Sequence, residues 1–174
     1  MTKEKLSALI EFMRQQNITV SELKQMSEYA AFYNGIPLME AGEELPLMLR
    51  YSDNSVSDRF TPMHRIKSVH LEDVDVDLNE FSIPMSYLNG LQNCRQAGKK
   101  MLTEKQAVQI YHQFNEVNAV LTAICAEPFR KSRYWLSDQA SKTYLAKAFD
   151  FSTGKVVELK RNDGCRIRPV LFKL

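Results

Sequence analysis

Residues 134–172 form a ladder of short strand-like segments separated by tight-turn sequences, and this ladder restricts the possible folds more than any other feature of the chain. Each turn combines Gly with Ser, Thr, Asn or Asp, the residues that antiparallel hairpins favour. We therefore predict a meander of β-strands. Its parts are Tyr134-Trp135, TYLAKAFDF (143–151), the turn Ser152-Thr153-Gly154, KVVELK (155–160), the turn Asn162-Asp163-Gly164 and a last strand, CRIRPVLF (165–172).

Two helices are predicted before this ladder, which makes the fold class α+β. The first lies between Pro84, which suits a first helical turn, and Gly98, which suits the end of a helix. The second begins at Thr103, because Thr103 and Gln106 form a capping box, and continues to Leu121 as one regular helix. Apolar stripes at helical spacing support both helices: Tyr87, Leu88, Leu91 and Cys94 in the first, and Ala107, Ile110, Tyr111, Phe114, Val117 and Leu121 in the second.

Short strands are also predicted between residue 43 and the first of these helices. LPLMLRYSDNSVSDRF (45–60) has the pattern of a hairpin with a polar turn at Asp53-Asn54-Ser55. HLEDVDVDL (70–78) carries four carboxylates, Glu72, Asp73, Asp75 and Asp77. A calcium loop of the EF-hand type needs Gly at its sixth position and Glu at its twelfth, and Leu78 and Pro84 stand there instead. We therefore expect a solvated acidic strand edge and no metal site.

Residues 1–42 are predicted to form a helical hairpin ahead of the domain of residues 43–174. An apolar stripe from Leu6 to Met13 marks the first helix, and the capping box of Thr19 and Glu22 starts the second. QQNITVSEL (15–23) superficially resembles a DNA-binding helix-turn-helix. The segment is net acidic, however, and no basic third helix follows, so no nucleic-acid binding is expected. The hairpin would pack against the following domain or against a second copy of the chain.

Composition favours a soluble, cytoplasmic protein. The 174 residues are 44% hydrophobic, enough for one core, and no apolar run reaches the ~20 residues of a membrane span. The N-terminus has no export-signal pattern. Cys94, Cys125 and Cys165 are far apart and odd in number, so they are expected to be reduced thiols. The motifs of nucleophile elbows, phosphate loops, zinc proteases and paired-cysteine sites are missing, which favours a non-enzymatic protein without cofactor or metal.

Charge is distributed unevenly along the chain. Residues 131–174 contain ten Lys or Arg and four Asp or Glu, a net charge of +6, whereas residues 43–130 contain nine and twelve, a net charge of −3. A basic segment attracts anionic partners through long-range electrostatics, although Lys and Arg on strands also serve solubility alone. The C-terminal segment is therefore the part of the chain in which a protein or anionic ligand would bind.

Five short stretches in this order resemble a bacterial family of C-type-lectin-like domains. They are YSDNSVSD (51–58), GKKMLT (98–103), YWLSD (134–138), AKAFDFSTGKV (146–156) and RIRPV (166–170). The family shows a YSDGT-S hairpin, a GWRLPT helix entry, a YWSS strand, an A-x-x-V-x-F-x-x-G-x-V hairpin and a terminal RVRPV, and it is related in fold to sulfatase-modifying-factor domains and to the variable proteins of diversity-generating retroelements. The resemblance covers residues 45–174 and implies a C-type-lectin-like fold for them.

The resemblance implies neither calcium binding nor oxidase chemistry. Calcium-dependent lectins use an E-P-N or Q-P-D loop and a W-N-D strand, whereas this chain has Glu127-Pro128-Phe129 and Tyr134-Trp135-Leu136. The oxidase relatives use a pair of cysteines, which Cys94 and Cys165 do not match in position. Further departures from the family pattern are Asn54, Lys99 and Leu102.

Two functions of different classes remain open. The first is a non-catalytic ligand- or protein-binding module that uses the polar residues of the C-terminal strands and turns: Ser137, Asp138, Gln139, Lys142, Tyr144, Lys160, Arg161, Asn162 and Asp163. Loops on a rigid scaffold are the usual place for recognition. The second is a structural or assembly protein, encoded by a phage or a mobile element, that oligomerises through residues 1–42.

Two residues of the ladder carry structural expectations of their own. Arg168, between Ile167 and Pro169, should be buried and should need carboxylate or carbonyl partners, because an unpaired buried charge is costly. Trp135, the single tryptophan, should be buried between the long helix and the sheet, with a partner for its indole N–H.

Overall fold

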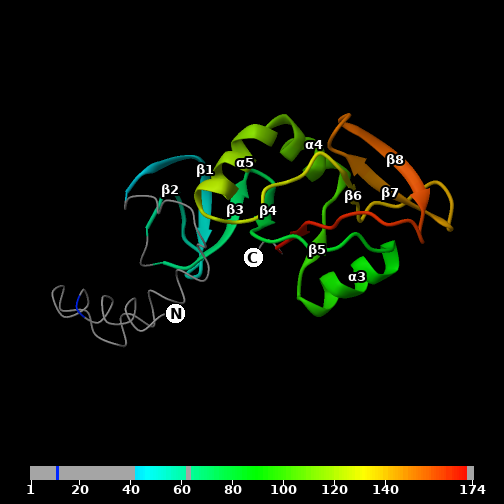
Figure 1. The fold of residues 1–174 in the computed structure, drawn as a ribbon, viewed down its shortest axis with the longest axis horizontal. Coiled ribbons are helices and arrows are strands. Elements are labelled where there is room, and N and C mark those ends of the chain that lie inside the picture. Colours follow the sequence, from blue (N-terminus) through cyan, green and yellow to red (C-terminus); the bar gives the residue numbers. More distant parts are fainter. Residues whose placement is uncertain (1–10, 12–41, 62–63, 172–174) are drawn as a thin grey trace. The chain divides into compact units, whose positions relative to one another are not determined.

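The computed structural model describes residues 11, 42–61 and 64–171. The helical hairpin predicted for residues 1–42 lies outside these residues, apart from Glu11 and Gly42. From Gly42 onwards the described residues are a mixed α+β arrangement of two antiparallel sheets and three helices (Figure 1). The C-terminal segment runs between the helices, with α4 (Glu104–His112) and α5 (Phe114–Ala123) on one side of it and α3 (Tyr87–Gln96) on the other.

The larger sheet has six strands in the order β2-β1-β3-β4-β9-β5. Their bounds are Glu44–Tyr51 for β1, Val56–Arg59 for β2, Ile66–Leu71 for β3, Val74–Asp77 for β4, Lys100–Met101 for β5 and Pro169–Val170 for β9. The predicted hairpin of residues 45–60 is confirmed as β1 and β2, which pair antiparallel. Asn54 in its turn has a φ of +67°, a left-handed conformation that Asn tolerates better than most residues.

The acidic stretch forms a second hairpin, β3 to β4, and the predicted solvated edge is wrong for two of its four carboxylates. Asp75 and Asp77 are buried. Asp75 Oδ1 accepts hydrogen bonds from Arg50 Nε at 2.9 Å and pairs with His70 Nδ1 at 2.8 Å, while Asp77 forms an ion pair with Lys99. These partners compensate the free-energy cost of removing the two carboxylates from water. The two carboxylates thereby link neighbouring elements of the fold.

The smaller sheet contains β6 (Arg133–Trp135), β7 (Leu145–Asp150) and β8 (Lys155–Lys160), in that order. The predicted hairpin from TYLAKAFDF to KVVELK is confirmed. The predicted last strand is wrong in position: the segment after Gly164 forms one parallel bridge with β6, between Arg166 and Tyr134, and then enters the larger sheet. Val170 pairs with both β4 and β5, so β9 lies inside the larger sheet. Proline lacks the backbone N–H of a strand interior, which fits Pro169 as the first residue of a two-residue strand.

The predicted long helix is two helices, α4 and α5, separated at Gln113. Its N-terminus is as predicted: Thr103 and Gln106 form the reciprocal hydrogen bonds of a capping box. The chain deviates from helical geometry at Gln113, whose φ is −113° and ψ is 29°. The break gives the two helices separate directions. α5 then packs on β1 and β3 of the larger sheet, while Tyr111 of α4 contacts Phe149 of the smaller one.

An aromatic cluster joins the smaller sheet to α4 and α5. Phe151 stands at its centre, with its ring centroid 4.8 Å from that of Phe149, 5.2 Å from Phe129 and 5.3 Å from Tyr134. Rings at such separations in tilted or edge-on arrangements stabilise each other beyond their buried area. The cluster forms the core on one face of β6 and β7.

Trp135 lies on the opposite face of β6, because consecutive strand residues point to opposite sides. It is buried, as predicted, and its Nε1 donates a hydrogen bond to the Met85 carbonyl at 2.8 Å. The expected position against the long helix is wrong, since Tyr87 at the start of α3 contacts the indole edge-on at 5.7 Å. The same core cluster includes Cys94 and Cys165. α3 therefore covers the second face of the smaller sheet.

Gly154→Ala is expected to lower the free energy of unfolding more than Gly98→Ala does. Both glycines have positive φ, +71° and +64°, where a side chain costs roughly 1–2 kcal/mol. A Cβ at Gly154 would also lie 2.6 Å from Tyr111 Cε1, whereas nothing lies within 4 Å of one at Gly98. The clash should add roughly 1–3 kcal/mol, as overpacking does. Urea denaturation measures both, and equal losses would show that Tyr111 moves aside freely.

Candidate functional site

Five of the nine polar residues predicted to bind a partner form one surface where β7 begins and β8 ends. Arg161 holds this end together. Its backbone N–H donates to the Tyr144 carbonyl at 3.2 Å, its Nε donates to the Leu145 carbonyl at 3.1 Å, and its own carbonyl accepts from Tyr87 N–H at 2.9 Å. Its guanidinium also lies over the Tyr87 ring, 5.4 Å from the centroid. The hairpin is thus fixed to the start of α3.

Five residues at this end form a surface that we name the C-terminal face: Lys142, Tyr144, Lys160, Arg161 and Asn162. Tyr144 is 59% exposed, and the Lys142 ammonium lies 5.8 Å from its ring centroid. Lys142, Lys160 and Asn162 are exposed as well, whereas Arg161 is half-buried. A large exposed aromatic ring between cations is therefore presented on a rigid strand end.

Two apolar side chains at the entry into α3 are exposed, and sequence reasoning did not find them. Leu88 was assigned to the buried stripe of its helix and is instead 56% exposed, while Ile83 is 65% exposed. Leu88 follows Tyr87, the ring under the Arg161 guanidinium. Helical spacing alone predicted the wrong side for Leu88, because Gly90 and Cys94 form the buried face of α3.

Four other residues predicted for the binding face are placed differently. Ser137 N–H donates to the Leu102 carbonyl at 2.7 Å, and Asp138 Oδ2 accepts from Glu104 N–H at 2.5 Å, so both stabilise the entry into α4. Asp163 Oδ2 accepts from Lys160 N–H at 3.0 Å and closes the last turn. Gln139 is exposed. The first three therefore serve the fold directly.

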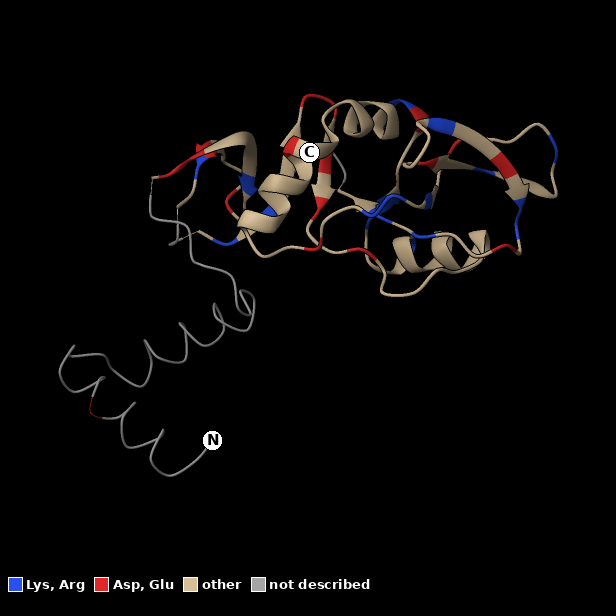
Figure 2. Ribbon diagram, turned by 45° about the horizontal axis from the view of Figure 1, so that its top comes forward, with Lys and Arg blue, Asp and Glu red and all other residues tan. Residues whose placement is uncertain are grey.

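Part of the basic excess of the C-terminal segment is neutralised by carboxylates from other parts of the chain. Lys147 pairs with Glu104 at 2.9 Å, and Arg166 pairs with Glu80 at 2.5 Å. Lys155 and Lys160 are exposed at the two ends of β8, and Lys131, Arg133 and Lys142 are exposed elsewhere in the segment. Figure 2 shows basic residues at both ends of β8 with an acidic residue between them, in agreement with its sequence KVVELK.

Glu80 is the centre of a buried charge network. Its Oε1 lies 2.5 Å from Arg166 Nη1 and 3.5 Å from Arg130 Nε, and its Oε2 accepts a hydrogen bond from the Tyr134 hydroxyl at 2.7 Å. Arg168 approaches the same carboxylate at 3.9 Å. Burial and the neighbouring carboxylate raise the pKa of Tyr134 well above its usual value, so its hydroxyl stays a donor.

The prediction for Arg168 is confirmed, because its side chain is buried among acceptors. Nη1 donates to the Asp77 carbonyl at 3.2 Å and Nη2 to the Glu127 carbonyl at 2.6 Å, and the Phe129 ring lies 4.6 Å from the guanidinium carbon. Burial lowers the pKa of Arg168, and the charge of Glu80 opposes that shift. Arg168 thus links β4, β9 and the segment after α5.

Two of the three cysteines are buried in the Trp135 cluster. Burial raises the pKa of the Cys94 thiol and that of the Cys165 thiol to about 11. Both groups are therefore protonated at neutral pH, whereas the thiolate is the nucleophile in cysteine chemistry.

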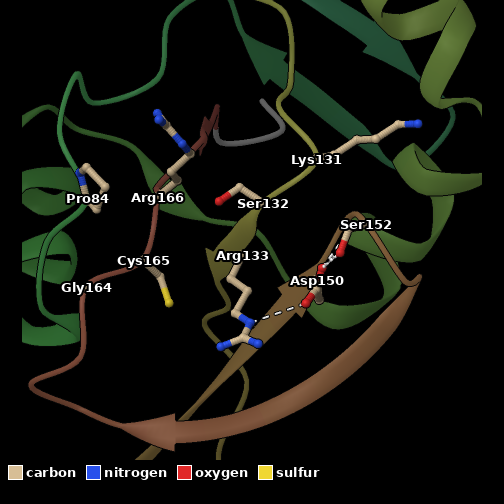
Figure 3. Close-up of a pocket in the computed structure, with 9 residues that line it drawn as sticks. All are labelled: Pro84, Lys131, Ser132, Arg133, Asp150, Ser152, Gly164, Cys165 and Arg166. Atoms are coloured by element: carbon tan, nitrogen blue, oxygen red, sulfur yellow. Dashed lines mark hydrogen bonds and ion pairs between the residues drawn. The ribbon is translucent and has the colours of Figure 1, made fainter.

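A pocket of about 270 Å³ lies between three segments that meet at the far end of β7 (Figure 3). One wall is residues 131–133, the second contains Asp150 and Ser152, and the third is residues 164–166 together with Pro84. The sequence signal for it is the tripeptide Lys131-Ser132-Arg133, which the analysis of turns and strands did not use. In Figure 3, the Ser132 hydroxyl and the Cys165 sulfur point into the space between the first and third walls.

No protein-family model matches the chain, and no curated protein is similar to it in sequence. None of the helices within the described ranges is both long and apolar enough to cross a membrane.

Proposed function

We propose that this chain is a non-catalytic binding module whose C-terminal face docks onto an acidic surface of a protein partner. The observation that carries the proposal is Tyr144, which is exposed and flanked by Lys142 and by the strand end that bears Lys160 and Arg161. Tyr and Arg dominate the energetic centres of protein interfaces.

Rigidity of the face supports this proposal. The hydrogen bonds of Arg161 to Tyr144, Leu145 and Tyr87 hold the hairpin end in one conformation. A preorganised surface loses less conformational entropy when it binds, so more of the contact energy appears as affinity.

A C-type-lectin-like scaffold is proposed for residues 45–174. The positions of the five resembling stretches support it. YSDNSVSD is the turn between β1 and β2, GKKMLT connects α3 to α4, and AKAFDFSTGKV is the β7–β8 hairpin. YWLSD contains the end of β6, and RIRPV ends in β9. Each stretch thus supplies a turn, a helix entry or a strand at a junction, where backbone geometry restricts the residue types most strongly.

Tyr144→Ala, Lys160→Ala and Asn162→Ala are expected to abolish or weaken partner capture while leaving the free energy of unfolding within about 0.5 kcal/mol of the parent, as exposed substitutions do. Met48→Ala is the matched control, because Met48 is 50% exposed on β1, in the other sheet. The measurement is capture from a lysate of the source cells at low and moderate salt, with identification of the retained proteins and direct binding of the purified candidate.

The docking face would be supported by a protein that the parent and the Met48→Ala variant retain and that the Tyr144→Ala variant loses. The binding of this protein should also weaken as the salt concentration rises. Retention of the same proteins by all variants would contradict it. If the parent retains no partner and deletion of residues 1–42 converts an oligomer to a monomer in size measurements, the assembly function is the correct one.

A further inference from the structure

The pocket at the far end of β7 carries an inference that does not depend on the C-terminal face. Its walls come from three segments that are distant in sequence: residues 131–133, the Asp150 turn and residues 164–166. Each wall is fixed by backbone hydrogen bonds. Phe151 N–H donates to the Ser132 carbonyl at 3.0 Å, and Arg166 N–H donates to the Arg133 carbonyl at 2.9 Å. The cavity is therefore part of the folded scaffold.

The acidic group of the pocket is already satisfied. Asp150 Oδ1 accepts from the Ser152 hydroxyl at 2.5 Å and from Ser152 N–H at 2.9 Å, and Oδ2 lies 3.2 Å from Arg133 Nε. These hydrogen bonds, led by that of the Ser152 hydroxyl, lower the pKa of Asp150, so the carboxylate is charged at neutral pH. A carboxylate with its lone pairs occupied in this way is a weak site for a cation. Arg133 lines the pocket, and its two Nη groups have no hydrogen-bond partner among the described residues.

The surroundings of the pocket are positive. Arg166 in the third wall shares Glu80 with Arg130 and Arg168, so that one carboxylate faces three guanidinium groups. Lys131 adds a further charge, and no ion-pair partner of Lys131 occurs within the described parts of the chain. Its stem is flexible enough to bring the ammonium group to the rim. Among the residues that line the pocket, three cations, Lys131, Arg133 and Arg166, stand against one carboxylate, Asp150, so an entering anion gains Coulomb energy.

We propose that this pocket binds the phosphate or carboxylate group of a small molecule. Arg133 would supply the paired N–H donors that match a planar or tetrahedral oxyanion, and the Ser132 hydroxyl, which points into the cavity, would supply a third (Figure 3). Pro84 and Gly164 provide uncharged walls for the rest of the ligand. Cys165 at the same wall does not repel an anion, because its thiol is protonated at neutral pH.

The size of the cavity limits the ligand. Its volume of about 270 Å³ is just below the range of small-molecule sites, which span ~300–1,000 Å³. A small carboxylic acid or a phosphorylated small molecule fits this range, whereas a polymer would have to present one end group only.

The test is an NMR titration of the full-length protein, followed through its backbone amide signals. The protein is titrated with inorganic phosphate and, in a separate experiment, with acetate. Sodium chloride at matched ionic strength is the reference. Saturable shifts at Ser132, Ser152 and Gly164 are expected with at least one of the two anions. The tighter anion identifies the group recognised. Shifts that match those of chloride, or that spread evenly over the exposed lysines, would overturn the proposal.

Two variants decide which groups make the site. Arg133→Gln should weaken binding of the tighter anion about tenfold, the usual effect of removing a hydrogen bond to a charged group. Lys142→Gln, which removes the same charge from the C-terminal face, should leave the dissociation constant unchanged within about twofold. Equal losses of affinity in the two variants would indicate that the anion responds to the general positive charge of the surface and that no specific site exists. If Arg133→Gln fails to fold, Ser132→Ala replaces it, and an unchanged dissociation constant for that variant would contradict the site.

Discussion

Arg168→Ala is expected to lower the free energy of unfolding by about 3–5 kcal/mol, because it leaves buried acceptors without their donor and removes one of the cations that surround Glu80. The Asp77 and Glu127 carbonyls each accept a hydrogen bond from this guanidinium. Its removal would also open a cavity against the Phe129 ring. Urea denaturation followed by circular dichroism measures the loss.

Arg59→Ala is the matched control for this prediction. Arg59 pairs with Glu44 at 3.1 Å on the surface, and exposed pairs of this kind contribute roughly 0–1 kcal/mol. Arg161 is unsuitable as a control, because it is half-buried and its Nε donates a hydrogen bond to the Leu145 carbonyl. Similar small losses for Arg168→Ala and Arg59→Ala would mean that Arg168 is hydrated in solution.

Trp135→Ala should cost about 3–5 kcal/mol of stability, the range for truncation of a core aromatic residue. The indole is 1% exposed and donates its N–H to the Met85 carbonyl, so the substitution creates a large cavity and removes one of the two hydrogen bonds to that carbonyl, which also accepts from Cys165 N–H. Trp135→Phe keeps most of the volume and should cost less. The comparison of the two in urea separates the effect of volume from that of the hydrogen bond.

The native protein reports on Trp135 directly, because the chain has no other tryptophan. Its fluorescence should be blue-shifted and poorly quenched by iodide, and unfolding in urea should shift the emission to the red. Ready quenching of the folded protein would place the indole at the surface and would argue for a carbohydrate-stacking platform in place of a core position.

Local features of the fold were predictable because neighbouring residues determine them. The turn at Asn54, the capping box of Thr103 and Gln106 and the hairpin turn that ends at Gly154 each depend on backbone geometry within a few residues. Binary patterns also placed α3 within a few residues of its bounds. In each case the local preference and the global fold agree, which is the usual condition in natural sequences.

The errors concern contacts between distant segments. Asp75 and Asp77 looked solvated because their partners Arg50 and Lys99 stand more than twenty residues away. The sequence predicted that β9 pairs with the neighbouring hairpin, because the pattern of a strand does not indicate which sheet the strand joins. Leu88 has the spacing of a buried residue, yet the position of the smaller sheet relative to α3 decides its exposure.

The candidate sites were predictable to different degrees. The exposed cations and Tyr144 of the C-terminal face follow from turn and strand patterns, because loop and strand-end residues are usually exposed. The anion pocket could not be predicted, since its walls meet only when β6, β7 and the segment after Gly164 are brought together. Arg166 carries no local sign that its charge is shared with Glu80.

The position of β9 has a consequence for how the domain is made. β9 pairs with β4 on one side and β5 on the other, so these two earlier strands are joined in the sheet only through residues near 170. A nascent chain that ends before Pro169 leaves the edges of β4 and β5 open. Long-range pairings of this kind form slowly, and open strand edges are prone to aggregation. The larger sheet therefore cannot close until residues 169–170 have been made, although β4 and β5 precede them by about 70 residues or more.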